Sequence, residues 1–148
     1  MRSSKADRHA ALWQAGAITT LALTMTAFGI AGVRQPASAT ELRIPIEELQ
    51  SGAAELALLC RERHAGQVTD SFYEAHLRHL ARTQRDSYRE LARLQVRPSL
   101  LPVKREAMDE GEQLARSLTM LRDGGTVDES ELHRVRDRLD ILAHGLRR

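Results

Sequence analysis

Residues 71–94 carry the sequence SFYEAHLRHLARTQRDSYRELARL, and this stretch decides the fold. The residues that we expect to face inward recur at alternating intervals of four and three, which is typical of one face of an amphipathic α-helix. Two polar residues, Gln84 and Ser87, occupy the middle of that face. A capping box formed by Ser71 and Glu74 predicts where the helix begins, and Pro98 predicts that it has ended. The complete face consists of Tyr73, Leu77, Leu80, Gln84, Ser87, Leu91 and Leu94.

Three further segments share this periodicity. One runs from about Pro45, a residue suited to a first helical turn, to His64. Another follows Pro102 and ends near Arg122, and the last begins at a second capping-box pattern in residues 126–129. Four helices joined by short turns predict an all-α, antiparallel up-down-up-down four-helix bundle. The alternative is a helical hairpin that dimerises. The predicted inward residues are Ile46, Leu49, Ala53, Leu56, Cys60, Ala107, Gly111, Leu114, Leu118, Leu121, Leu132, Val135, Leu139, Leu142 and Leu146.

The first 39 residues have the parts of a secretory signal. Arg2, Lys5 and Arg8 precede a largely apolar run over residues 10–33, and the small-residue triplet Ala37-Ser38-Ala39 follows it. We therefore predict a signal peptide over residues 1–39 and a helical domain over 40–148. The alternative is an uncleaved membrane anchor, because an apolar run of about 24 residues is long enough to span a bilayer.

The leader also explains the apparent basicity of the chain. The 148 residues hold 22 Lys and Arg against 20 Asp and Glu, a net charge of +2. Residues 1–39 contain four of the bases and one of the acids, which leaves 18 bases and 19 acids in residues 40–148. That remainder is near neutral, and its only aromatic residues are Phe72, Tyr73 and Tyr88. Neither a basic stripe nor a stacking platform is present, so we do not expect nucleic-acid binding.

Motifs of known enzyme classes are missing, since the sequence has no Gly-rich phosphate loop, no His-Glu-x-x-His and no Cys-x-x-Cys. We therefore expect a non-enzymatic protein with a binding or protein-interaction role. The most suggestive chemical set is Cys60, His64 and His76. Cys60 and His64 lie one helical turn apart, and the turn near Gly66 brings His76 alongside. A thiolate and two imidazoles are ligands for Cu or Zn, so periplasmic metal binding or sensing is an alternative function.

Other residues suggest contacts with ligands or partners. Met108 and Met120 are candidate thioether ligands, although isolated methionines beside a leucine face are more often core residues. Leu58, Phe72 and Ile141 project away from the predicted buried faces. They are candidates for a surface that binds a protein partner or a second copy of the chain.

The exported four-helix architecture resembles the soluble periplasmic cytochrome b562 family. The best local matches are the segment Ala65-Gly66-Gln67-Val68-Thr69-Asp70 and the stretch 124–148, which has a histidine near its end. The resemblance implies a four-helix bundle and a periplasmic location.

That family holds haem b between a methionine early in its first helix and a histidine near the end of its last helix. In register, Leu49 stands at the methionine position, and the leucine face of the last helix places Ala143 inward with His144 beside it. The resemblance therefore implies, as a further alternative, a haem-b electron-transfer protein with unusual ligation. His144 and Met108 are its candidate ligands.

Overall fold

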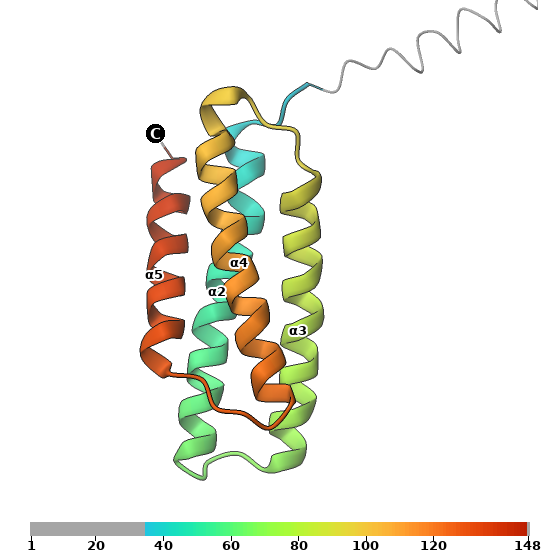
Figure 1. The fold of residues 1–148 in the computed structure, drawn as a ribbon, viewed down its shortest axis with the longest axis vertical. Coiled ribbons are helices and arrows are strands. Elements are labelled where there is room, and N and C mark those ends of the chain that lie inside the picture. Colours follow the sequence, from blue (N-terminus) through green and yellow to red (C-terminus); the bar gives the residue numbers. More distant parts are fainter. Residues whose placement is uncertain (1–34, 148) are drawn as a thin grey trace, which may run out of the picture. The chain divides into compact units, whose positions relative to one another are not determined.

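The structure is a computed structural model that describes residues 35–147, so most of the predicted leader lies outside it. The described chain forms four α-helices and one short 3-10 helix (Figure 1). Within these residues there is no strand, and an isolated bridge joins Ala37 to Val96. The all-α prediction is therefore confirmed. The helices are α2 (Ala39–His64), α3 (Asp70–Arg93), α4 (Leu101–Arg122) and α5 (Glu129–Gly145), with η1 (Pro98–Leu100) before α4.

One hydrophobic core joins the four helices. Helix α2 contacts α3, α4 and α5, and α4 also contacts α3 and α5. The periodic faces predicted from the sequence supply this core, because leucines three or four residues apart lie on one side of each helix. All predicted inward residues of α3 are buried except Leu94, which is half-buried. The largest fully buried side chains include Leu42, Ile46, Leu49, Leu56, Leu80, Leu91, Leu114, Leu132 and Leu139.

Helix α2 begins six residues before the predicted start at Pro45, so that prediction was wrong. A capping box at Ser38 and Glu41 sets the true start: Ser38 Oγ accepts from the Glu41 amide at 3.2 Å. The Glu41 carboxylate accepts from the Ser38 amide at 2.7 Å. The Ser38 hydroxyl donates to the same carboxylate, and the two bonds that the carboxylate accepts favour its charged form and lower the pKa of Glu41. Pro45 lies inside the helix, where its buried ring packs in the core.

The caps of α3 and α5 also differ from the sequence pattern. Thr69, not Ser71, caps α3 by accepting from the Phe72 amide at 3.3 Å. Asp128 caps α5 by accepting from the Ser130 amide at 3.0 Å. In both helices the preferred cap is the residue whose extended backbone directly precedes the first turn.

The predicted end of the leader falls at the first residue of α2. Ala37 is buried and its amide donates to the Gln95 carbonyl at 2.6 Å, while Ser38 caps the helix. The triplet identified as a cleavage site thus takes part in the fold. Among the helices of the described part, none has an apolar stretch long enough to cross a bilayer.

Candidate functional site

The polar middle of the α3 face meets α2. Gln84 is 4% exposed and Ser87 is 2% exposed, although both are polar. Ser87 donates from Oγ to the Glu48 carboxylate at 2.7 Å. Gln84 donates from Nε2 to the Glu48 main-chain carbonyl at 3.4 Å, a long and weak bond. Glu48 is therefore the residue of α2 around which the polar side chains of α3 gather.

Gly52 makes room for the Gln84 amide. A Cβ atom at position 52 would lie 1.5 Å from Gln84 Nε2 and 3.2 Å from its Oε1, so any larger residue there displaces the amide. The amide therefore lies against α2. Its Oε1 is buried and has no hydrogen-bond partner in the structure. Because a buried acceptor without a partner costs about 1–3 kcal/mol, this atom needs an explanation.

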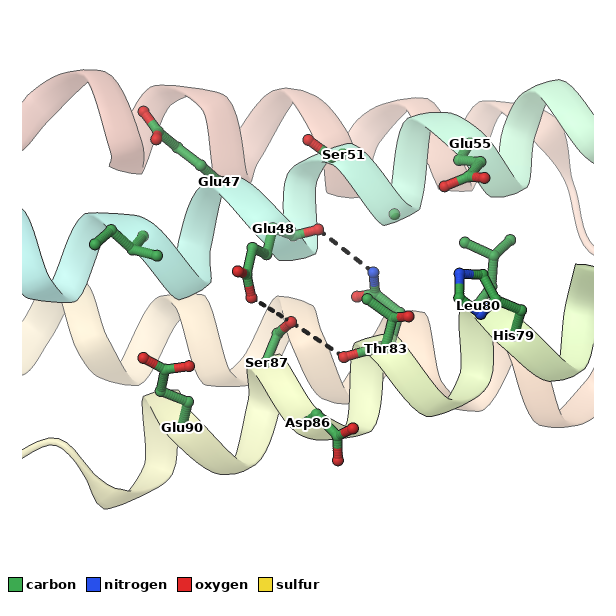
Figure 2. Close-up of a pocket in the computed structure, with 13 residues that line it drawn as sticks. Glu47, Glu48, Ser51, Glu55, His79, Leu80, Thr83, Asp86, Ser87 and Glu90 are labelled. Atoms are coloured by element: carbon green, nitrogen blue, oxygen red, sulfur yellow. Dashed lines mark hydrogen bonds between the residues drawn. The ribbon is translucent and has the colours of Figure 1, made fainter.

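A groove of about 540 Å³ runs between α2 and α3 over this point (Figure 2). Figure 2 shows Glu48 pointing from α2 toward Ser87, with Glu55 farther along the same helix. Carboxylates and hydroxyls dominate the lining, which contains no arginine and no lysine. Gly52 and Gln84 both belong to it. The complete lining is Ile44, Glu47, Glu48, Ser51, Gly52, Glu55, His79, Leu80, Thr83, Gln84, Asp86, Ser87 and Glu90.

The five carboxylates of the groove differ in their partners. Glu47 lies 3.5 Å from Arg43 and 3.0 Å from Arg147, and Glu55 lies 2.7 Å from His76 Nε2. Asp86 lies 3.9 Å from Arg89, at the limit of an ion pair.

Two groove acids remain without a base. Among residues 35–147, neither Glu48 nor Glu90 has a basic partner within 4 Å. Elsewhere the described surface intersperses acids with bases. The groove therefore keeps a net negative charge.

Comparison with protein-family models, curated proteins and solved structures finds no match to this chain. The chemistry of the groove is therefore the basis for a function. Carboxylate oxygens and an amide carbonyl accept hydrogen bonds and donate none. Such a set favours a ligand that carries positive charge and several N–H donors.

The predicted metal-binding trio is not brought together. Cys60 and His64 line a second cavity of about 630 Å³ at the end of α2, together with Arg61, Arg63 and residues of the α4–α5 connection. His76 is absent from that lining. It contacts Glu55, and its ring stacks on the Phe72 ring with 5.4 Å between the two ring centres. Within residues 35–147, no three His, Cys, Asp or Glu side chains form a group that could hold a metal ion.

The second cavity also offers little reactive chemistry. Burial raises the pKa of the Cys60 thiol, and a hydrogen bond from Tyr73 only partly opposes that effect. The thiol form is a poor nucleophile and a poor metal ligand. Arg63 is already engaged, since its guanidinium lies 3.9 Å from the centre of the Tyr73 ring and 3.6 Å from Asp70.

The haem candidates occupy different surroundings. Leu49, at the methionine position of the resemblance, is fully buried, and Ala143 is the inward residue of α5 as expected. The His144 side chain is 58% exposed, and its Nδ1 lies 2.9 Å from the Asp140 carbonyl. Met108 is half-buried against the core on α4. His144 is therefore directed toward solvent and away from the interior of the bundle.

The predicted surface residues lie where the sequence placed them. Leu58, Phe72 and Ile141 are all exposed, and so is Met120, one of the two candidate thioether ligands. They are distributed over α2, α3, α4 and α5.

Gln84 and Ser87 are recognisable in the sequence as polar residues on a buried face, but their partners on α2 are not. Gly52 was the available signal. A glycine inside a helix costs about 1 kcal/mol relative to alanine, so it often marks a close approach by another group. Glu48 and Glu55 flank it at intervals of four and three, which places the three residues on one stripe.

Proposed function

We propose that this protein is an exported, non-enzymatic four-helix bundle that binds organic cations in the groove between α2 and α3. One observation carries the proposal: five carboxylates and neither arginine nor lysine line the groove, above a buried amide oxygen that lacks a partner. A bound ammonium group would supply both the missing charge and the missing donor. Gln84 Oε1 would then accept a hydrogen bond from the ligand.

An antiparallel arrangement of α2 and α3 is part of this proposal. It is supported by the order of the contacts between the two segments: as the residue number on the α2 side rises, the residue number of its partner on the α3 side falls. Ala37 bonds to Gln95, Glu48 to Ser87 and Glu55 to His76. In this order Glu48 lies beside Ser87 and Glu55 lies beside His76, one on each side of Gly52 along α2.

The groove favours a cation through short-range electrostatics. Unit charges 4 Å apart attract by about 4 kcal/mol at the effective dielectric constant near a protein surface, and by about 1 kcal/mol in water. Glu48 is held by Ser87, so its carboxylate is already oriented before a ligand arrives. Because the groove is open, added salt weakens the attraction.

Removing the two carboxylates that lack a base tests the proposal. We expect putrescine, a four-carbon diamine, to bind the full chain saturably in titration calorimetry. Replacing Glu48→Gln and Glu90→Gln together should weaken binding at least tenfold, about 1.4 kcal/mol or more. Glutamine at position 48 still accepts from Ser87, so the change removes charge with little loss of structure.

The matched control removes the same charge elsewhere. Asp109→Asn with Glu112→Gln alters two exposed acids of α4 that do not line the groove. We expect this variant to bind putrescine within about twofold of the parent, because distant exposed charges are screened. Equal losses in the two double variants would mean that the groove is not the binding site.

Export is proposed from the basic start, apolar run and small-residue triplet of residues 1–39. Sequencing the N-terminus of the protein from its native host tests this. Thr40 as the first residue is the expected result, and Met1 would instead indicate a retained anchor. Because Ala37 and Ser38 contact the folded domain, we expect any cleavage to precede folding.

A further inference from the structure

We propose that the ligand of the α2–α3 groove is a linear polyamine bound by ammonium groups at two ends. This inference rests on the proposed function and narrows it to one class of cation. It follows from how the acceptors are spaced along the groove, with Glu48 and Glu55 on either side of the hydroxyls of Ser51 and Thr83 (Figure 2).

The spacing of Glu48 and Glu55 sets the length of the ligand. They are seven residues apart on α2, which corresponds to about 10.5 Å along the helix axis at 1.5 Å per residue. A four-carbon diamine is too short to reach both carboxylates. An extended triamine of spermidine length, with bonds of about 1.5 Å, spans a distance of this order.

The middle of the groove suits a central amine. Between the two glutamates lie the hydroxyls of Ser51 and Thr83 and the partnerless Gln84 Oε1. A secondary ammonium group has two N–H donors and two flanking methylenes. It would give Gln84 Oε1 its donor from the groove side, since the space beside Gly52 is taken by the Gln84 amide itself.

The Glu55 end remains available to a ligand. His76 Nε2 lies 2.7 Å from one oxygen of Glu55, yet the Glu55 side chain is still 46% exposed. His79 lines the groove at the same end. A compact divalent cation fits this arrangement less well, because the described residues contain no three-ligand group for a metal.

A panel of amines at constant ionic strength tests the length of the ligand. Putrescine and a linear eight-carbon diamine carry the same charge, but the longer one matches spermidine in length. We expect the long diamine to bind the full chain about tenfold more tightly than putrescine, since it reaches a second carboxylate. Spermidine should bind more tightly still, because its central amine meets Gln84.

Two variants test which residues cause the tighter binding of the long diamine and of spermidine. Glu55→Gln should reduce the advantage of the long diamine over putrescine to about twofold or less, because one charge contact is lost. Glu62→Gln, a control on the same helix outside the groove lining, should keep the full advantage. Gln84→Leu should remove the further gain of spermidine over the long diamine.

The outcomes separate the two proposals. If putrescine and the long diamine bind with equal affinity, and both need Glu48 and Glu90, the two-ended polyamine inference is overturned while cation binding stands. If no amine binds saturably, or if Glu48→Gln with Glu90→Gln changes nothing, the proposed function fails as well.

Discussion

Leu49→Ala is expected to lower the free energy of unfolding by about 3 kcal/mol, within the 2–5 kcal/mol typical of large-to-small changes in a core. Leu49 is fully buried on α2, a helix that contacts all three others. Its Cδ1 lies 3.3 Å from the position that a Cβ at Gly111 would occupy, so α4 packs closely against it. The backbone of two helices must move before such a cavity closes. Urea unfolding of the full chain, followed by circular dichroism, measures the change.

Leu58→Ala is the matched control for this variant. Leu58 is a leucine of the same helix, but its side chain is exposed. We expect a change of at most about 0.5 kcal/mol, as for most surface substitutions. If the two variants lose similar stability, the assignment of Leu49 to the core is wrong.

Gln84→Leu is expected to make the protein more stable and to weaken cation binding. The substitution removes a buried acceptor that has no partner, which costs about 1–3 kcal/mol in the parent. It replaces that acceptor with a shorter, branched apolar side chain in a face that also contains Leu77, Leu80 and Leu91. We expect a gain of about 1 kcal/mol in the free energy of unfolding, and at least tenfold weaker binding of spermidine. Because most substitutions destabilise a protein, a gain in stability together with a loss of spermidine binding would identify Gln84 as a ligand-binding residue.

Gln113→Leu is the matched control, because it replaces a glutamine whose amide already has a hydrogen-bond partner. Gln113 lies on α4 outside the groove, and its Nε2 donates to Glu131 at 2.6 Å. Since this amide already has its partner, we expect its loss to give no stabilisation, and binding should be unchanged. A stability loss of more than about 1 kcal/mol in Gln84→Leu would contradict our interpretation of the buried amide as a ligand group.

The buried faces of the helices were predictable because a heptad-like spacing leaves little freedom. In α3, residues from Tyr73 to Leu91 that follow this spacing are all buried, including the polar Gln84 and Ser87. Burial there follows from position on the helix, and not from the hydrophobicity of each residue alone. The orientation of His144 away from the core followed from the same geometry.

The start of α2 was not predicted because one short segment supports two interpretations. Ala37, Ser38 and Ala39 have the small side chains that a signal peptidase requires, and Ser38 is also the cap of a helix. Assigning them to the leader hid the capping box with Glu41. Pro45 then looked like a first-turn residue, although burial of its ring compensates for one missing hydrogen bond inside the helix.

Only the α3 side of the groove could be recognised in the sequence. Gln84 and Ser87 were recognisable as polar interruptions of one face, but their partners belong to another helix. Which residues of α2 lie opposite depends on the register between the helices, and the turn between them does not reveal it. The position of His76 depends on the same register: it contacts Glu55, more than a turn before Cys60 on α2, and is not brought beside Cys60 and His64.

The most direct test of the groove as a cation site is a titration of the full chain with spermidine, followed by amide resonances. We predict saturable shifts at Ser51, Gly52 and Thr83–Ser87 and in the side-chain amide of Gln84. The outer face of α4, from Glu112 to Met120, should be unaffected. Shifts spread evenly over acidic surface residues, or confined to the cavity that contains Cys60, would contradict the account.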